Sequence, residues 1–363
     1  MIDEIIKKAA VRPPGKRGEA VAVGMSGGAD SSVAAYLLRE AGYSVTGLTL
    51  ELSGEAGHIA GQDEALAVRA AKICEKLGIL HDTFDVRELF DEKVRRTFVE
   101  AYESGRTPNP CVRCNETVKF PAIARYADSR GIPLIATGHY AALARVGGRV
   151  LLSAAADEAK DQTYFMYRVP VRLLERAVFP LGRTTKDEVR LIAARLGIDA
   201  HTGRESQDIC FIPDGDTQAF LERYIRARSG DVVDAGGRVL GRHGGIHRYT
   251  IGQRKGLGIS TGSPAYVTEI DAGGGRVVLS GENDLFSRTV ICGNLKMRTR
   301  DLALPLRAKI RYRHPPAPIR AISVSGGRCV VTFEREQRAP TPGQSLVIYR
   351  DKDIIGGGII SGT

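Results

Sequence analysis

Residues 21–32 read Val-Ala-Val-Gly-Met-Ser-Gly-Gly-Ala-Asp-Ser-Ser, and this stretch decides how the first half of the chain folds. It begins apolar and β-prone, as a buried parallel strand does. It turns at Ser26-Gly27-Gly28, and a helical pattern follows from about Ser31 to Ala41. A strand, a glycine turn and a helix start form an anion site, because the first N–H groups of a helix lack partners and its dipole favours negative charge. The stretch therefore predicts a phosphate-binding loop.

The loop is neither a Walker A motif, which needs Lys-Ser/Thr after the glycines, nor a G-x-G-x-x-G dinucleotide turn. It resembles the SGGxDS loop of the ATP-pyrophosphatase, or PP-loop, superfamily, whose members cut ATP between the α- and β-phosphates and adenylate a carbonyl oxygen. An ordinary glycine-rich turn is the alternative, and five matching residues between strand and helix argue against it. Asp30 is a candidate either to orient Mg²⁺ or to cap the helix.

Length and composition predict a globular protein of two or three domains. The chain has 363 residues, 43% of them hydrophobic, and a net charge of +10. Its apolar runs are too short to span a bilayer, and residues 1–17 lack the apolar core of an export signal. Six cysteines in a chain of this length do not make a disulfide scaffold, so we expect a reducing compartment, the cytoplasm, and no membrane partner.

The positive charge is concentrated at the C-terminal end. Residues 286–363 contain 14 Lys and Arg but five Asp and Glu, a net charge of +9. A basic end domain on a near-neutral body is typical of nucleic-acid-binding proteins, although a merely soluble basic domain has the same composition. Arg311 and Arg313 stand two apart in a predicted strand, which would place both on one face.

Between about residues 20 and 200 the pattern alternates between strands and helices, which predicts an α/β domain with a parallel sheet and helices on both faces. Strands are expected at 21–25, 45–50, 80–85 and 133–137, and helices at 31–41, 63–77, 89–104, 120–130 and 186–196. Ligands bind at the carboxyl ends of such strands, so the loops after Met25, Leu50 and Thr137 should surround one nucleotide.

The alternation stops near Arg204. A glycine-rich stretch with one helix at about 217–228 follows, and then come short alternating segments at 306–312, 319–324, 329–334 and 345–349. These predict a small antiparallel barrel. We therefore expect a catalytic α/β domain over 1–205, a connecting domain over 206–285 and a C-terminal β-barrel over 286–363.

Two further segments carry candidate chemistry. Cys111 and Cys114 form a Cys-x-x-Cys after two prolines, and Cys210 stands among polar residues in a β-prone stretch. Zinc usually needs further ligands at fixed spacing, a thioredoxin-type pair follows a strand, and two incidental buried cysteines are the simplest alternative. The three other cysteines, Cys74, Cys292 and Cys329, fit core positions.

Taken together, these signals resemble the tRNA-specific 2-thiouridylases, which place sulfur on the wobble uridine of certain anticodons. The resemblance runs from end to end. It rests on eight segments in order: 24–32, 107–120, 136–140, 160–165, 206–212, 249–258, 311–313 and 341–345. It implies a PP-loop domain, a connecting domain and a C-terminal barrel that binds tRNA.

The resemblance also implies site residues. The ATP-binding residues would be Gly24, Met25, Ser26, Gly27, Gly28, Ala29, Asp30, Ser31, Leu50 and Gly138. Contacts to tRNA fall on Asn109, Pro110, His139, Lys160, Asp161, Gln162, Arg311, Tyr312 and Gln344. Cys114 falls at the nucleophile, and Cys210 at the cysteine that carries a persulfide, which Cys114 attacks or resolves as a disulfide.

The implied reaction is ATP-dependent adenylation of the C2 oxygen of uridine, with Mg²⁺ on the phosphates, followed by attack of sulfur on C2. The base must leave its stack, which costs a few kcal/mol and is easier in a single-stranded anticodon loop. One position departs from the family pattern, since Cys111 stands where several members have aspartate. Cys111, Cys114 and Cys210 together also match the ligand set of RNA thiolases that hold a [4Fe–4S] cluster.

A persulfide relay and a cluster mechanism both stay open at this stage, as do the sulfur donor (a protein or inorganic sulfide), the tRNA species and the oligomeric state. Two other functions compete. A PP-loop ligase or amidating enzyme acting on a small molecule has no need of three cysteines or a basic barrel. A non-catalytic tRNA-binding protein would not need an intact phosphate loop.

Overall fold

The computed structural model describes residues 2–9, 18–52, 66–198, 209–212 and 215–363. The chain divides into two compact units. The first comprises Met1–Val94, Cys111–Gly215 and Lys352–Ile354, and the second comprises Arg95–Pro110, Asp216–Asp351 and Ile355–Thr363. Each unit has its own hydrophobic core. In the described part of the chain, no helix is both long and apolar enough to cross a membrane.

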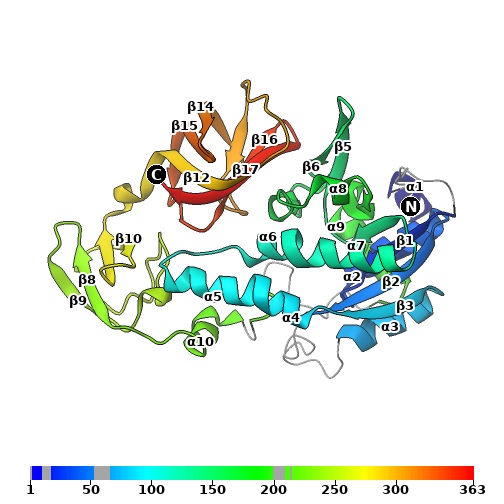
Figure 1. Cartoon of the computed structure of the whole chain (residues 1–363), viewed down its shortest axis with the longest axis horizontal. Helices are drawn as coiled ribbons and strands as arrows, with labels where there is room; N and C mark the ends of the chain where they lie inside the picture. The colour runs from blue at the N-terminus through cyan, green and yellow to red at the C-terminus, as the bar shows by residue number, and fades with distance from the viewer. Residues whose placement is uncertain (1, 10–17, 53–65, 199–208, 213–214) are drawn as a thin grey trace. The chain divides into compact units, whose positions relative to one another are not determined.

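A five-stranded parallel sheet forms the centre of the first unit (Figure 1). Its order is β3-β2-β1-β4-β7, with bounds Leu80–Asp85, Ser44–Glu51, Ala20–Gly24, Leu134–Thr137 and Ala177–Val178. The chain moves outward from β1 through β2 to β3, and then returns to the other side of β1 as β4. The strand order thus reverses between β1 and β4, and this is where ligands bind in open α/β sheets, beyond the carboxyl ends of the strands.

Helices cover both faces of this sheet, as the sequence predicts. Val21 and Val23 of β1 join one core cluster with residues of α1 (Ile2–Ala9), α2 (Ala29–Glu40), α3 (Leu66–Lys76) and α9 (Lys186–Arg195). Gly24 lies on the opposite face, where a Cβ would stand 2.9 Å from Cδ1 of Ile123 in α7 (Phe120–Ser129). Alternate residues of a strand face opposite sides, so β1 is buried from both directions.

The segment before α7 is helical with one irregular turn. Helix α6 (Pro110–Cys114) runs into the π-turn η2 (Asn115–Lys119), which continues as α7. A second π-turn, η1 (Asp91–Arg95), lies between α4 (Arg87–Phe90) and α5 (Arg96–Glu103). Such turns occur often at functional sites, and η2 follows Cys114 directly.

The remaining elements of the first unit are short. The hairpin β5–β6 (Ala142–Val146, Arg149–Ser153) is antiparallel, and its Ser153 pairs with Asp353. The others are η3 (Thr163–Phe165), α8 (Val171–Leu174) and η4 (Pro180–Arg183).

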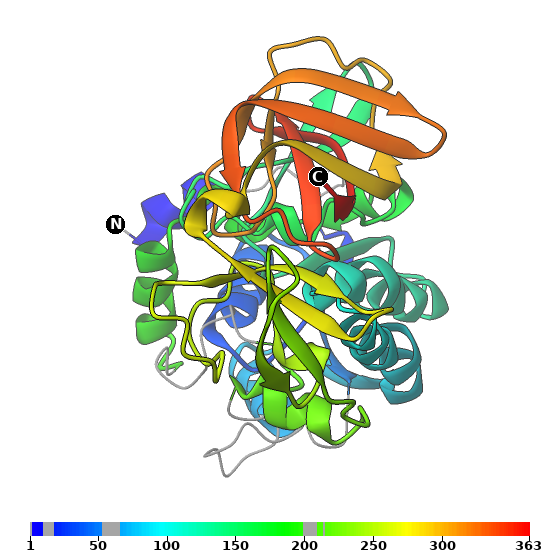
Figure 2. The same cartoon turned by 90° about the vertical axis from the view of Figure 1, so that its left-hand side faces the viewer.

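The second unit contains a small sheet and a closed barrel. The sheet has the order β10-β11-β8-β9, with bounds Tyr266–Asp271, Arg276–Ser280, Gly230–Asp234 and Val239–His243. The barrel follows the order β12-β15-β14-β13-β16-β17, and pairing of β12 with β17 closes it. In Figure 2 its orange and red strands curl round one another. The barrel strands span Phe286–Met297, Arg328–Arg338, Ala317–Ser325, Arg307–Lys309, Ser345–Arg350 and Asp353–Gly362. This unit also contains helix α5, helix α10 (Thr217–Glu222) and the 3₁₀ turns η6 (Ile246–Arg248) and η7 (Glu282–Leu285).

The fold class predicted from the sequence is confirmed, and two local predictions need correction. The strand expected at 306–312 ends at Lys309, so Arg311 and Arg313 lie in bends and turns beyond it, not on one face of a strand. The helix expected at 217–228 ends at Glu222. The helix expected at 63–77 is seen as α3 from Leu66, and residues 63–65 lie outside the described part of the chain.

Cys74, Cys292 and Cys329 are fully buried, as predicted. The division at residues 205/206 and 285/286 stays a prediction.

Candidate active site

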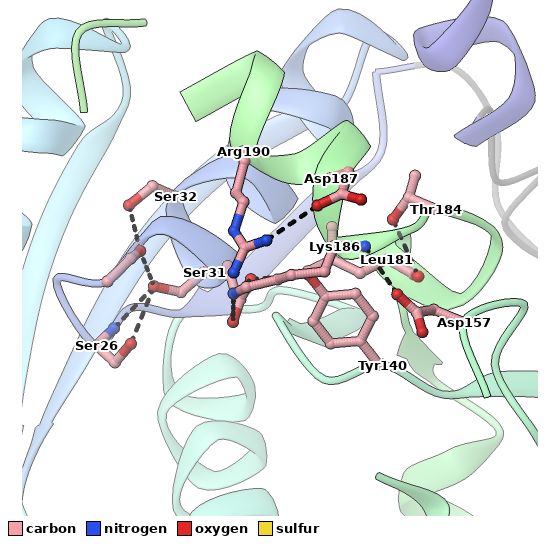
Figure 3. Close-up of polar contacts among 12 residues, drawn as sticks. Ser26, Ser31, Ser32, Tyr140, Asp157, Leu181, Thr184, Lys186, Asp187 and Arg190 are labelled. Atoms are coloured by element: carbon pink, nitrogen blue, oxygen red, sulfur yellow. Dashed lines mark hydrogen bonds and ion pairs between the residues drawn. The ribbon is translucent and has the colours of Figure 1, made fainter. Parts of the chain in front are cut away.

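The loop after β1 is shaped by its own serines and leaves the start of α2 open. The backbone N–H of Ser26 donates to Oγ of Ser31 at 3.1 Å, and that hydroxyl donates to the carbonyl of Gly28 at 3.1 Å (Figure 3). Gly27 has a φ of +72°, which favours glycine. Gly28 is the N-cap of α2, with no side-chain cap. Among the described residues, no side chain caps this helix start, which suits an anion at the switch point of the sheet.

Gly138, directly after β4, packs against the start of α2. A Cβ at this position would lie 2.7 Å from the backbone nitrogen of Ser31. Only glycine allows the loops after β1 and β4 to approach this closely. The two strand ends predicted to flank a nucleotide thus do lie together, while the ATP contacts of the individual residues, Leu50 included, stay predictions.

Asp30 has partners that the sequence analysis missed. Its carboxylate pairs with Nζ of Lys186, the first residue of α9, at 2.7 Å, and accepts a hydrogen bond from the hydroxyl of Tyr140 at 2.9 Å. Figure 3 labels Lys186 and Tyr140. Burial, and then the charge of Asp30, strongly raise the pKa of the Tyr140 hydroxyl. Asp30 is not the helix cap, because Gly28 occupies that position and Asp30 lies in the first turn.

Sequence reasoning placed Lys186 only in a helix. The capping box Thr185-x-x-Glu188 at that helix start was available as a signal.

The cysteines Cys111, Cys114 and Cys210 belong to the first unit and share one electrostatic environment. Burial raises the pKa of Cys111 to about 11 and that of Cys114 to about 12. Cys210 is exposed, and partial desolvation of its thiol raises its pKa as well. The charge of Lys119 opposes each shift, and hydrogen bonding by the Lys119 backbone also lowers the pKa of Cys114.

Charge on Cys210 further raises the pKa of the other two thiols, so the three sulfurs lie within electrostatic range of one another. All are free thiols. Among the described residues, no group of three or more His, Cys, Asp or Glu is arranged to hold a single metal ion.

Asp161 and Gln162, predicted to contact tRNA, shape the loops around the site. Asp161 is 6% exposed, and its carboxylate accepts hydrogen bonds from the N–H of Ala155 and the hydroxyl of Thr163. The side-chain oxygen of Gln162 accepts from the N–H of Tyr140 at 2.9 Å. Both side chains therefore support the backbone of neighbouring loops, and any direct contact with RNA stays a prediction.

His139 lies between the ring of Phe120, on which it stacks, and the Thr137 hydroxyl, 2.7 Å from its Nδ1. Burial, and then the nearby Lys119 charge, lower the pKa of the imidazole well below its usual value. His139 is therefore neutral near pH 7. Its predicted role in tRNA binding would accordingly be one of shape and hydrogen bonding.

In the second unit, two predicted tRNA contacts are engaged with the protein. The guanidinium of Arg311 donates to the carbonyls of Ile251 and Ala339, both at 3.1 Å, and to the hydroxyl of Thr341 at 2.6 Å. The amide of Gln344 donates to the carbonyls of Thr107 and Pro108. Gln344 thus fixes the segment that leads to Asn109 and Pro110. Contacts of tRNA with these four residues, and with Lys160 and Tyr312, stay predictions.

Comparison with known proteins addresses the family. Three family models match in succession: the tRNA methyl transferase HUP domain over residues 19–214, its PRC-barrel domain over 218–281, and the aminomethyltransferase β-barrel domain over 288–360. A tRNA-specific 2-thiouridylase MnmA of Clostridium botulinum is 41% identical over 350 residues, covering 94% of this chain and 97% of the relative. The chain belongs to the tRNA-specific 2-thiouridylase family.

A second relative supports the same family. A tRNA-specific 2-thiouridylase MnmA of Clostridium perfringens is 40% identical, over 94% of this chain and 98% of its own. Among solved structures, the U34-tRNA thiolase NcsA from Methanococcus maripaludis with its [4Fe-4S] cluster is 21% identical over 57% of this chain and 67% of its own, with a TM-score of 0.38. A similarity this low assigns no function to this chain.

Proposed function

We propose that this protein is an ATP-dependent tRNA-uridine 2-sulfurtransferase that converts the wobble uridine to 2-thiouridine, releasing AMP and pyrophosphate. The proposal rests on two features that belong to one compact unit. An uncapped helix start at the switch point and three thiols around Lys119 belong to the same compact unit. The first suits a nucleotide phosphate, and the second suits sulfur transfer.

The reaction needs both parts because the uracil C2 oxygen is a poor leaving group. The O2 atom attacks the α-phosphate of ATP, a new O–P bond forms, and pyrophosphate leaves. Sulfur then attacks C2, and the C2–O2 bond breaks as AMP departs. The open N–H groups of α2 would hold the phosphates, and Asp30 would hold the Mg²⁺ that neutralises their charge.

The donor set fits two sulfur chemistries. In a relay, Cys210 carries a persulfide whose outer sulfur attacks C2, and the Cys114 thiolate then attacks the remaining Cys210 sulfur to form a disulfide. Oxidation of these two thiols supplies the two electrons that the transferred sulfur gains, and an external thiol must reduce the disulfide. In the other chemistry, the thiolates of Cys111, Cys114 and Cys210 would hold a [4Fe–4S] cluster, which supplies an open iron for sulfide.

The substrate in this proposal is tRNA with a wobble uridine, and the net charge of +9 after residue 286 supports electrostatic attraction to its phosphates. The sulfur donor would be a persulfide-bearing protein or inorganic sulfide. The activity requires the cytoplasm, where ATP and tRNA are present and thiols stay reduced.

The test is thiolation of an unmodified tRNA with a wobble uridine, using ATP, Mg²⁺ and sulfide or a persulfide donor under anaerobic conditions. Mass spectrometry of the nucleosides should show 2-thiouridine, with one AMP formed per sulfur. The same tRNA with cytidine at the wobble position is the control. ATP–pyrophosphate exchange without tRNA would instead favour a ligase for a small molecule, and tRNA binding without ATP turnover would favour a binding protein.

A further inference from the structure

Asn115 carries a buried acceptor atom that nothing in the described protein uses. The residue follows Cys114, begins η2 and is 3% exposed. Its Nδ2 donates to the carbonyl of Phe165 at 3.1 Å. Because a carbonyl can only accept, this contact fixes the orientation of the amide and leaves Oδ1 on the other side. Among the described residues, Oδ1 has no hydrogen-bond partner.

An atom of this kind calls for an explanation. Buried polar atoms almost always find partners, and one left unsatisfied costs about 1–3 kcal/mol. A framework of hydrogen bonds holds the Asn115 side chain in this unsatisfied position. The N–H of Phe165 donates to the carbonyl of Gln162, whose side chain holds the N–H of Tyr140 in the loop after β4. Asn115 is thus linked by hydrogen bonds to the loop beside the predicted nucleotide site.

We propose that Oδ1 of Asn115 accepts a hydrogen bond from N3–H of the target uracil and so selects uridine over cytidine. This inference rests on the proposed function. In uracil, N3 is bonded to C2, the atom that sulfur attacks. Asn115 follows Cys114, which takes part in either sulfur chemistry, in the same helical segment. Its acceptor is therefore a candidate to read N3.

Cytosine has an unprotonated N3, and two acceptors facing each other would leave Oδ1 unsatisfied. Sites that hydrogen-bond a substrate N–H reject analogues without it by large factors. Oδ1 is buried in the free protein, so the base must displace the groups that cover this atom when it enters.

The experiment compares anticodon stem-loops that carry uridine, cytidine or N3-methyluridine at the wobble position. Binding and single-turnover adenylation are measured for the wild type and for Asn115→Ala. Thr117→Val is the control, because the Thr117 hydroxyl donates to the Arg113 carbonyl of its own helix at 2.8 Å. The melting temperature of each variant is measured alongside.

The wild type should prefer uridine over both analogues by about 100-fold or more. Asn115→Ala should adenylate uridine about 10- to 100-fold more slowly. It should adenylate N3-methyluridine at least as fast as the wild type does, because the space left by the Asn115 side chain accepts the methyl group. Thr117→Val should keep the wild-type preference.

Two results would overturn the inference: wild-type enzyme that accepts N3-methyluridine as readily as uridine, or Asn115→Ala that slows both substrates by the same factor. The first of these needs no variant, so the inference stays testable if Asn115→Ala does not fold. If the wild type did not adenylate the uridine stem-loop at all, that result would contradict the proposed function instead.

Discussion

Nζ of Lys186 lies 2.7 Å from Oδ1 and 2.9 Å from Oδ2 of Asp30, and this contact joins the start of α9 to the start of α2. A lysine in the first turn of a helix opposes the helix dipole, so its contact with Asp30 offsets an unfavourable position. Both side chains are about one quarter exposed, at 24% and 26%. The ammonium therefore stands at the phosphate loop and within reach of solvent, where ATP phosphates would compete with Asp30 for it.

Lys186→Met should weaken ATP binding by about 10- to 100-fold, the range expected for removing a hydrogen bond to a charged group. Calorimetric titration with ATP and Mg²⁺ measures this directly. Lys8→Met is the matched control, because Lys8 pairs with Glu188 of the same helix at 2.8 Å and takes no part in the phosphate loop. Equal ATP affinity in the two variants would show that the Lys186 contact is structural only.

Gly28→Val should abolish adenylation while leaving the fold intact. The backbone at Gly28 is extended, with φ −95° and ψ 165°, and the nearest atom to an added Cβ is the Ser26 hydroxyl at 3.5 Å. Valine thus fits the free protein but fills the space that a phosphate would approach. The expected result is an unchanged melting temperature and tRNA affinity with no detectable pyrophosphate release. If the variant thiolates tRNA near the wild-type rate, this loop does not bind the phosphates of ATP.

Gly138→Ala should differ from Gly28→Val because it affects the fold as well as the activity. Its Cβ would lie 2.7 Å from the backbone nitrogen of Ser31, where neither side can give way easily. This variant should lose stability as well as activity, with a clear fall in melting temperature. If both glycine variants melt at the wild-type temperature, the close approach of the loops after β1 and β4 is not required for folding.

The sequence predicts the parallel sheet and the phosphate loop because both depend on local patterns. The apolar run to Met25, the glycines and the helix after them are contiguous, so no tertiary information is needed. The partnership of Asp30 with Lys186 spans 156 residues and depends on where α9 docks. The environment of Asn115 likewise depends on Phe165, fifty residues away. Long-range interactions of this kind leave little local signal. The one signal here is Lys186, whose place in the first turn of a helix is unfavourable and points to a negatively charged partner.

Arg311 shows why the strand predicted at 306–312 ends earlier than expected. The alternation of 306–312 predicts a strand, but β13 ends at Lys309 and the Arg311 guanidinium turns to bind three backbone and side-chain oxygens. Hydrogen bonding to those oxygens takes precedence over the alternating pattern.

Arg311→Ala and Arg313→Ala should therefore behave differently. Removing the Arg311 guanidinium takes one hydrogen bond from each of three oxygens, and the Ala339 carbonyl keeps its bond from the Thr341 hydroxyl. Because a hydrogen bond to a charged group contributes about 1.5–3 kcal/mol, the variant should melt at a lower temperature. Arg313 is exposed, so Arg313→Ala should keep the stability and reduce the salt dependence of tRNA binding. The slope of log K against log salt should fall by about 0.7 to 0.9 for each phosphate that the variant no longer neutralises. An unchanged slope for Arg313→Ala would place the RNA surface elsewhere.

Cys111→Ser separates the two sulfur chemistries. In the relay, Cys210 carries the sulfur and Cys114 resolves it, so Cys111 has no chemical step and the variant should keep substantial activity. If the three thiolates ligate iron, the variant should lose the cluster, its brown colour and thiolation together. Cys114→Ser and Cys210→Ser should be inactive in either case, and Cys74→Ser, a core change, controls for damage to the fold.

The measurement is single-turnover thiolation after anaerobic reconstitution with iron and sulfide, alongside iron analysis and the visible spectrum. Activity near the wild-type level in iron-free Cys111→Ser would exclude the cluster, because no other residue described near Cys114 and Cys210 offers a third thiolate. Activity and iron lost together would exclude the relay, since a bystander thiol cannot control both. Inorganic sulfide would then serve as a donor for the wild type but not for the variant.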